Sequence, residues 1–346
     1  MFAIDRRRLL GGALITGGFA ACPSFRRTPK PRPLNDRLSG DLAGIHDPVL
    51  IREGDVYHVF GSGGWNKKAS PTWRVSRDLH HWTDNGEVFE EVPAWVREKV
   101  PGGTVFWAPD IARVDDQFRM YYAVSTGGSR RSVIGFATTP TLDRTSPRYG
   151  WTDRGMVIET HENSTFNAID ANFVADADGA HWLVFGSYWT GIKMIALDRE
   201  TGKRLPGDTQ IESLAYLPAP NDYGNNPIEG AFVFAHDGWY YLFASYQYCC
   251  RGASSNYSVS VGRSRSVHGP YLDNHGRPMM GGYGFEVLSD WPFGSSNFRG
   301  PGHCGLYHDG DRDLIVYHAD DVKAGAPVLR IAELAWSRDD WPAAIV

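Results

Sequence analysis

Residues 47–61 read DPVLIREGDVYHVFG, in which an acidic residue precedes an apolar run, a turn and an aromatic-rich strand. Four later segments, which begin at Asp110, Asp170, Glu229 and His303, repeat this order: DIARVDDQFRMYYAVS, DANFVADADGAHWLVFG, EGAFVFAHDGWYYLFAS and HCGLYHDGDRDLIVYHA. The leading residues are 63, 60, 59 and 74 positions apart. Such a period, with several short strands in each unit, is typical of a β-propeller. The sequence therefore predicts an all-β, five-bladed β-propeller in which each leading residue begins the innermost strand of a blade.

Length and composition fit one propeller domain. The chain has 346 residues, and five four-stranded blades of ~60 residues account for residues 39–346. Frequent aromatic residues and 39 glycines are expected of packed sheets that are joined by tight turns. The net charge of -5 is spread without long runs, and no basic recognition motif is present, so we expect no nucleic-acid partner. Because a propeller closes on itself, we expect a monomer.

The N-terminus has the pattern of a targeting segment. Arg6, Arg7 and Arg8 precede the apolar residues 11–21, a run too short to span a bilayer as a stable helix. Paired arginines followed by leucines resemble a twin-arginine export signal, and residues 20–22 resemble a lipoprotein cleavage site with Cys22 as the lipidated residue. We expect residues 1–22 to be an export signal and the Pro- and Arg-rich residues 23–38 a linker. The protein would then be periplasmic, lipid-anchored to a membrane face, or secreted.

Three of the leading residues could perform acid–base chemistry in the central channel. Hydrolysis of a glycosidic bond takes two carboxyl groups, one to protonate the leaving oxygen and one to activate water or attack the sugar. A third acidic group nearby raises the pKa of the acid, because like charges disfavour ionisation. Asp47, Asp170 and Glu229 fit this trio. Asp110 occupies the same repeat position, and we interpret it as a support of the channel wall.

His303 is the leading residue of the fifth repeat, within Gly300-Pro301-Gly302-His303. It either holds a cation in the channel or makes a structural hydrogen bond. One histidine does not make a zinc site, so the ion would be hard and mostly water-coordinated, such as calcium.

The cysteines do not form a disulfide framework or a metal-binding CxxC motif. Cys249 and Cys250 are adjacent, and adjacent cysteines bridge only through a strained ring. A Cys249–Cys250 disulfide remains open, but the default expectation for these two residues and Cys304 is small buried thiols near a pocket wall.

Several short motifs, in this order, resemble glycoside hydrolase family 43, and most of all its endo-1,5-α-L-arabinanases. They are Gly44-Ile45-His46-Asp47-Pro48, Phe106-Trp107-Ala108-Pro109-Asp110-Ile111, Asn167-Ala168-Ile169-Asp170, Gly186-Ser187-Tyr188-Trp189, Ile228-Glu229-Gly230, Cys249-Cys250-Arg251-Gly252, Val261-Gly262-Arg263-Ser264 and Gly300-Pro301-Gly302-His303. The resemblance runs from about Leu42 to Trp341. It implies a five-bladed propeller that cleaves internal α-1,5-L-arabinofuranosidic linkages of arabinan with inversion of configuration.

The resemblance also implies roles for individual residues. Asp47 would be the general base, Glu229 the general acid, and Asp170 the group that tunes the pKa of the acid and orients it. His303 matches a histidine that lies near a calcium ion in the channel, so we expect one calcium ion there. The expected substrate-binding residues are Trp107, Gly135, Asn167, Ser187, Tyr188 and Trp189.

Two alternatives remain open at this stage. An exo-acting arabinanase, an α-L-arabinofuranosidase or a β-xylosidase would share the fold and the acidic trio, because loop shape over the cleft decides the specificity. A non-catalytic propeller that binds glycans would need no acid and base at these positions.

Overall fold

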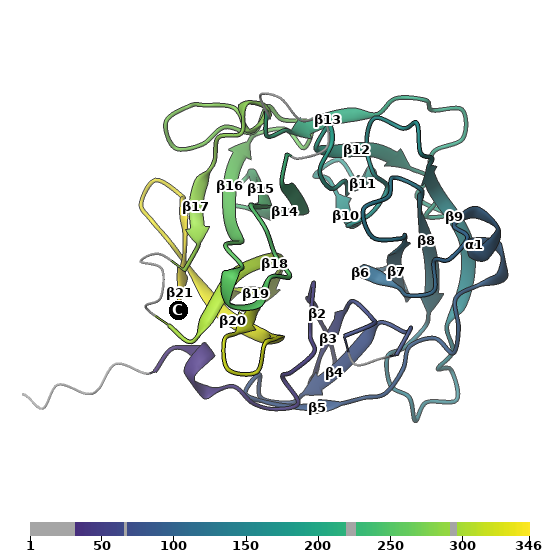
Figure 1. The fold of residues 1–346 in the computed structure, drawn as a ribbon, viewed down its shortest axis with the longest axis horizontal. Helices are drawn as coiled ribbons and strands as arrows, with labels where there is room; N and C mark the ends of the chain where they lie inside the picture. The colour runs from purple at the N-terminus through teal and green to yellow at the C-terminus, as the bar shows by residue number, and fades with distance from the viewer. Residues whose placement is uncertain (1–31, 66–67, 219–225, 291–295) are drawn as a thin grey trace, which may run out of the picture. The chain divides into compact units, whose positions relative to one another are not determined.

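The computed structural model describes residues 32–65, 68–218, 226–290 and 296–346, and its five sheets are arranged in a ring around a common axis (Figure 1). Each sheet contains four strands that follow one another along the chain, and the first sheet has one added strand. The first strand of every set of four lies innermost and the fourth outermost (Figure 1). The predicted five-bladed β-propeller is thereby confirmed.

The strands have the following bounds. Blade 1 contains β2 (Val49–Glu53), β3 (Val56–Gly61), β4 (Thr72–Ser76), β5 (His81–Asp84) and the added β1 (Ser39–Gly40). Blade 2 contains β6 (Trp107–Val114), β7 (Gln117–Val124), β8 (Ser132–Thr139) and β9 (Thr152–Thr160). Blade 3 contains β10 (Asn172–Ala175), β11 (His181–Phe185), β12 (Ile192–Leu197) and β13 (Glu212–Ala215). Blade 4 contains β14 (Ile228–His236), β15 (Trp239–Tyr246), β16 (Ser258–Ser264) and β17 (Phe285–Leu288). Blade 5 contains β18 (Phe298–Asp309), β19 (Arg312–Asp321), β20 (Ala326–Trp336) and β21 (Pro342–Ile345).

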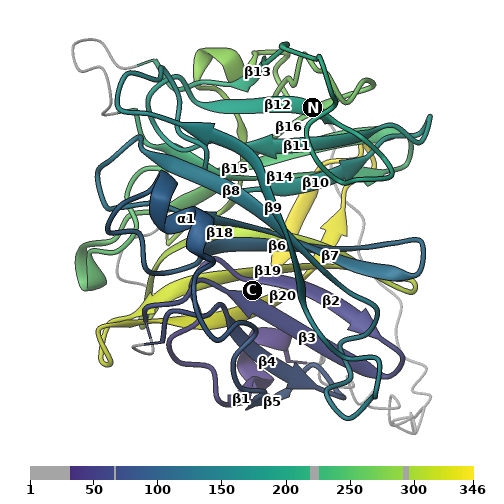
Figure 2. The same cartoon turned by 90° about the vertical axis from the view of Figure 1, so that its right-hand side faces the viewer.

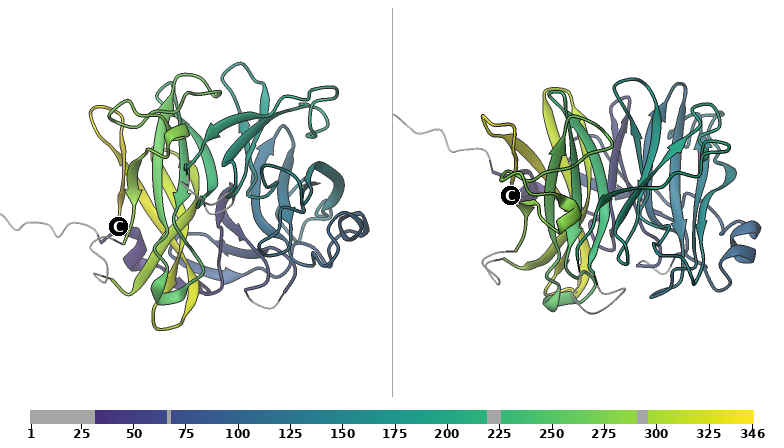
Figure 3. Two further views of the ribbon diagram at one scale, coloured as in Figure 1. Left: turned by 45° about the horizontal axis from the view of Figure 1, so that its top comes forward. Right: turned by 90° about the horizontal axis from the view of Figure 1, so that it is seen from above.

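Short helices lie outside the sheets: η1 (Leu34–Arg37), α1 (Ala94–Lys99), η2 (Gly252–Ser254) and η3 (Met279–Gly281). Helix α1 lies beside the outer part of blade 2 (Figure 2), where Val96 is fully buried against that blade. Further side views show the right-handed twist of the sheets (Figure 3). Among the residues that the structure describes, no helix is long and apolar enough to cross a membrane.

The segment before blade 1 closes the ring. β1 pairs in parallel with β5, while the Leu42 carbonyl oxygen accepts a hydrogen bond from the Leu329 N–H in blade 5 at 2.9 Å. Leu34 and Asn35 are buried, and Asn35 donates through its side chain to the Tyr317 hydroxyl of blade 5. The prediction that residues 23–38 are a linker was therefore wrong for residues 34–38, because Leu34 has apolar surface to bury against the propeller. Residues 1–31, which include the expected signal and Cys22, lie outside the described residues.

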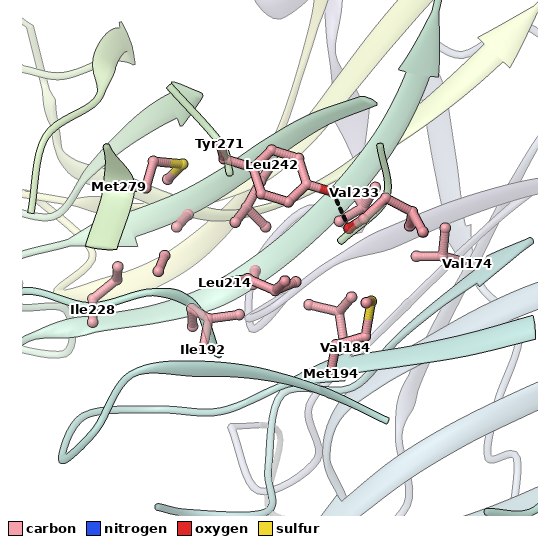
Figure 4. Close-up of a cluster of buried hydrophobic side chains, with 14 of the residues drawn as sticks. Val174, Val184, Ile192, Met194, Leu214, Ile228, Val233, Leu242, Tyr271 and Met279 are labelled. Carbon is pink, nitrogen blue, oxygen red and sulfur yellow. Dashed lines mark hydrogen bonds between the residues drawn. The ribbon is translucent and has the colours of Figure 1, made fainter. Parts of the chain in front are cut away.

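The interior between neighbouring blades is filled by apolar side chains. Figure 4 shows the cluster between blades 3 and 4, where Val184 and Met194 of blade 3 face Val233 and Leu242 of blade 4. The Tyr271 hydroxyl is also buried there, and it donates a hydrogen bond of 2.8 Å to the Val267 carbonyl oxygen. Each blade is thus held by two apolar faces, which fixes the inner strands that bound the channel.

The equivalent residue of every blade has a left-handed backbone at the entry to the innermost strand. Asp47, Ala108, Asp170, Gly230 and His303 have φ angles between 37° and 59°. This conformation is uncommon for residues other than glycine. The chain accepts it here in each of the five blades, so the turn into the channel is a property of the repeat.

Asp110 and Glu229 do not share this position, so that part of the sequence interpretation was wrong. Asp110 lies two residues after Ala108, and Glu229 lies one residue before Gly230. In both strands the left-handed residue lies within a register shift of the ladder, where the inner strand has one residue more than its partner, and the same kind of shift surrounds His303 in β18. An extra residue of this kind changes the direction of the side chains around it.

The carboxylate of Asp110 joins blades 2 and 3. One oxygen accepts the backbone N–H of Phe173 at 2.6 Å and the side-chain amide of Asn172 at 3.2 Å. Asn172 in turn accepts the backbone N–H of Val233 in blade 4 at 2.9 Å. Polar side chains two residues after the left-handed residue therefore connect the inner strands of blades 2, 3 and 4.

We predict that Asp110→Ala lowers the free energy of unfolding by about 1–3 kcal/mol, because it leaves the buried N–H of Phe173 without an acceptor. Asp110→Asn keeps an oxygen at this position and should lose less. Urea unfolding at pH 7 measures both variants. Equal stability of wild type and the alanine variant would contradict the inter-blade role.

The pH dependence of stability provides a control for this prediction. Burial raises the pKa of Asp110 from its usual 3.8 to about 6, although the hydrogen bonds from Phe173 and Asn172 oppose the change. The folded state therefore binds this proton more tightly than the unfolded state, and the associated stability is lost as pH rises through about 6. Wild type should lose stability relative to Asp110→Asn between about pH 4 and pH 7.

Candidate active site

The three acidic residues of the predicted trio and His303 meet in one cavity of about 280 Å³. Asp47 and Asp170 lie two residues before the first residues of β2 and β10, and Glu229 and His303 lie in β14 and β18. The residues that line the cavity are His46, Asp47, Ser62, Gly63, Trp65, Trp107, Ile169, Asp170, Glu229, Cys249, Cys250 and His303. Four of the five blades therefore contribute charged side chains to a single space.

The carboxylate of Asp47 is held by three neighbours. One oxygen lies 2.7 Å from Nδ1 of His46 and 2.9 Å from Nδ1 of His303, and the other accepts the Ser62 hydroxyl at 2.5 Å. Burial by itself would raise the pKa of Asp47, but the charges of His303 and His46 and their hydrogen bonds outweigh it and hold the pKa well below its usual value. Asp47 is therefore ionised at neutral pH, as a base must be.

His303 carries the opposite charge. Burial lowers its pKa, but the carboxylates of Asp47 and Asp170 reverse this effect and raise the pKa to about 9. The backbone N–H of His303 donates to the Ser245 hydroxyl at 2.7 Å, which fixes the strand. Its ring lies so close to Gly230 that a Cβ on this glycine would be 2.9 Å from Cγ of the imidazole. Glycine at position 230 thus makes room for the cation beside the acids.

Asp170 has the environment of a carboxyl group that resists ionisation. It is 6% exposed, and its carboxylate accepts a hydrogen bond from the Gly230 N–H at 3.2 Å. Burial raises its pKa, His303 opposes this, and the charges of Glu229 and Asp47 add to the rise. Titratable groups whose environments drive their pKa values apart are typical of acid–base sites.

Both oxygens of Glu229 accept hydrogen bonds. Oε2 accepts the Ser187 hydroxyl at 2.6 Å and Oε1 accepts the Tyr257 hydroxyl at 2.9 Å. Tyr257 is fully buried, and a Cβ on Gly302 would be 2.0 Å from its ring. The glycine at position 302 is therefore required by the residue that orients Glu229.

The predicted substrate-binding residues fall into two groups. Trp107 lines the cavity, and the Ser187 hydroxyl donates to Glu229. Burial and then the charge of Glu229 raise the pKa of the Tyr188 phenol. All three residues are therefore close to the acids. Of the six, only Trp107 is a lining residue of this cavity, and the remaining three have other contacts. Trp189 packs against the Arg130 guanidinium at 5.6 Å. The Asn167 amide oxygen accepts the Ser132 hydroxyl at 2.6 Å, and Gly135 lies under the Tyr122 ring.

The cysteine prediction needs a correction. Cys249 and Cys250 form a disulfide and line the cavity, whereas Cys304 is a free and buried thiol, as expected. Cys250 has a left-handed backbone, with φ of 64°, which allows the two adjacent sulfur atoms to meet.

The surroundings of His303 offer little to a metal ion. Its Nδ1 faces Asp47, which leaves only Nε2. Among the described residues, two groups of three side chains have possible ligand atoms close enough together to hold a metal ion, and neither group includes His303. Both nitrogens of an imidazolium carry protons, so a bound metal would have to displace one. Only an ion that keeps most of its water ligands fits here.

Sequence reasoning missed four residues that contact the acids or their partners. Ser62 and Tyr257 donate to Asp47 and Glu229, His46 contacts Asp47, and Nδ1 of His318 accepts the Asp47 N–H at 3.1 Å. Burial lowers the pKa of His318 well below its usual value, so it is neutral and can accept.

Comparison with known proteins agrees with this geometry. The model of glycosyl hydrolases family 43 matches residues 42–342. The chain is 35% identical over 307 residues to the extracellular exo-α-(1→5)-L-arabinofuranosidase ArbA of Cellvibrio japonicus, covering 86% of this chain and 85% of that protein. It is also 35% identical over 301 residues to the extracellular endo-α-(1→5)-L-arabinanase 1 of Bacillus subtilis, covering 86% and 87%.

A solved structure shares the fold as well. The α-L-arabinanase of Cellvibrio cellulosa complexed with arabinohexaose superposes with a TM-score of 0.81 at 33% identity, over 88% of this chain and 96% of that chain. The family match covers nearly the whole propeller, and the two relatives exceed 30% identity over most of their length. The chain therefore belongs to glycosyl hydrolases family 43.

Proposed function

We propose that this protein hydrolyses α-1,5-L-arabinofuranosidic linkages inside arabinan chains with inversion of configuration. The observation that carries the proposal is the cavity in which Asp47 is held ionised while Ser187 and Tyr257 orient Glu229. Asp47 would take a proton from water, and Glu229 would protonate the leaving oxygen. Asp170 would orient Glu229 and tune its pKa through the charge interaction between them.

Arabinan is the favoured substrate because the similar proteins are named for it. The two relatives are an exo-α-(1→5)-L-arabinofuranosidase and an endo-α-(1→5)-L-arabinanase, and the solved structure is an arabinanase complexed with arabinohexaose. The exo-acting relative is as similar as the endo-acting one, which makes exo action the second candidate. Internal cleavage requires space for the arabinan chain on both sides of the cavity. Exo cleavage requires that the cleft be blocked on one side, so that only a chain end fits.

The non-catalytic binding module is the weaker candidate. A glycan-binding surface needs hydrogen bonds and stacking rings, and it does not need an ionised carboxylate held by two histidines and a serine beside a second oriented carboxyl group. Burial of these charges costs free energy, and acid–base catalysis is a function that requires them.

We further propose that one calcium ion occupies the channel near His303 with mostly water ligands. Support comes from the carboxylate of Asp47, which lies 2.9 Å from the His303 ring, and from the charges of Asp170 and Glu229 beside it. Calcium accepts six to eight oxygen ligands, and water can supply most of them. A bound ion would add to the electrostatic field of the channel.

Export is the proposed fate of the chain. The twin arginines, the short apolar run and Cys22 support it, as do the two relatives, both of which are named extracellular. The finer proposals are a lipid anchor at Cys22 and a periplasmic or membrane-face location for a monomeric enzyme.

Substitution of the two acids tests the catalytic proposal. We expect Glu229→Gln and Asp47→Asn to lower kcat on linear arabinan by about 10²–10⁴-fold, because each removes one proton-transfer step. Asp110→Asn is the matched control, since Asp110 is a buried carboxylate on an inner strand outside the cavity, and this variant should keep its activity. Chromatography of the products over time separates a spread of oligosaccharides, the endo result, from a single product size. If the wild-type protein binds arabinan and releases no sugar, the proposal that it is an enzyme is rejected.

Metal analysis tests the calcium proposal. We expect protein purified without chelators to contain about one calcium per chain by mass spectrometry, and chelation to lower Tm because the ion binds only the folded state. His303→Asn should reduce the calcium content. A metal-free preparation whose Tm does not respond to calcium would end this proposal.

The mature N-terminus tests the export proposal. Mass spectrometry of protein from the native host should find a chain that begins at Cys22 with added acyl mass, because cleavage at a lipoprotein site precedes the modified cysteine. An unmodified terminus after cleavage elsewhere would retain export and reject the anchor. A full-length intracellular chain would reject both.

A further inference from the structure

Trp65 is an exposed aromatic residue at the catalytic cavity that acid–base chemistry does not use. Its side chain is among the cavity lining, and 42% of the residue is exposed. Large apolar surface left open to solvent costs free energy unless a partner covers it. A tryptophan beside the acids is therefore a candidate for direct contact with the substrate.

The ring of Trp65 is held in place. It stacks on His46, with ring centroids 4.8 Å apart and planes 22° from parallel, and His46 also stacks on His318, with ring centroids 3.8 Å apart. His46 also contacts the Asp47 carboxylate at 2.7 Å. The stack therefore places the tryptophan at a fixed distance from the proposed base, with one residue between them.

The two glycines that precede Trp65 are also constrained. The Gly63 N–H donates to the Phe106 carbonyl oxygen at 2.8 Å, and the Gly64 N–H donates to the Lys68 carbonyl oxygen at 2.6 Å. A Cβ on Gly63 would be 2.3 Å from the Ala69 carbonyl oxygen, so only glycine permits this close approach. A preorganised ring loses little conformational entropy when a ligand binds.

Apolar surface continues from Trp65 along the cavity wall. Sγ of Cys250 lies 3.3 Å from Nε2 of His46, and the disulfide, Trp107 and Ile169 also line the cavity. A furanose ring has apolar C–H groups as well as hydroxyl groups. Aromatic faces accept the C–H groups, while the acids and histidines accept or donate to the hydroxyls. The cavity offers both kinds of surface side by side.

We propose that Trp65 is a specificity-determining residue that stacks on an arabinofuranosyl unit bound next to Asp47. This inference rests on the proposed function, since it names a contact within the same site. Trp65 has no group that moves a proton, so its contribution is binding, which acts equally on the ground state and the transition state. The alternative is that Trp65 only covers His46 and keeps Asp47 in position.

The kinetics of Trp65→Ala and Trp65→Phe on linear arabinan and arabinotriose separate these roles. We expect the alanine variant to raise KM by about tenfold with little change in kcat, the pattern of lost uniform binding. The phenylalanine variant should stay close to wild type, because it keeps an aromatic face. Tyr283→Ala is the matched control, since Tyr283 is 44% exposed and does not line the cavity.

Calorimetry in a Glu229→Gln background measures the same contact without turnover. Trp65→Ala in this background should bind arabinotriose about tenfold more weakly, and thermal unfolding should show that the variant is folded. Unchanged KM and affinity would overturn the proposal. A fall in kcat with unchanged KM would also overturn it, in favour of the covering role. Wild type that is folded yet inactive on arabinan would reject the proposed function, and this inference would fall with it.

Discussion

The buried charge pair of Asp47 and His303 is the interaction on which the site depends. Two ions out of water cost several kcal/mol each unless they are paired and their remaining atoms are hydrogen-bonded. His46 and Ser62 supply the remaining partners of the carboxylate. Asp47 lies just before the innermost strand of blade 1, and His303 lies in the innermost strand of blade 5. The pair therefore forms only when the first and last blades come together. The contact that completes the propeller therefore also completes the acid–base site.

The left-handed residues at the channel entry explain how five similar blades form one asymmetric site. The backbone is strained wherever a residue other than glycine has a positive φ, and such strain concentrates at functional sites. Here Asp47, Asp170 and His303 use the turn to direct charged groups into the channel. At the same position, Ala108 has no polar group, and Gly230 leaves space for the His303 ring. The repeat sets the geometry, and the residue type decides what each blade contributes.

The sequence allowed the fold to be predicted, and with it the meeting of Asp47, Asp170 and Glu229 in one cavity, because these residues recur at nearly the period of the blades. The period alone does not determine which neighbours a side chain on an inner strand contacts. Asp110 lies two residues after the left-handed Ala108, and its carboxylate contacts the neighbouring blade and does not line the cavity. Ser62 and Tyr257 lie outside the inner strands, where no repeated pattern indicates their contacts with the acids. Trp65 follows two glycines that read only as a turn in the sequence, although the fold places it at the cavity.

The anomeric configuration of the first product tests the central claim most directly. If Asp47 activates water on the face opposite the bond that Glu229 protonates, the new sugar end forms inverted. Proton NMR of linear α-1,5-arabinan during the first minutes of digestion should show the β anomer before the α anomer appears by mutarotation. Early release of the α anomer would mean that a carboxylate attacks the sugar directly, and the roles assigned to Asp47 and Glu229 would be wrong.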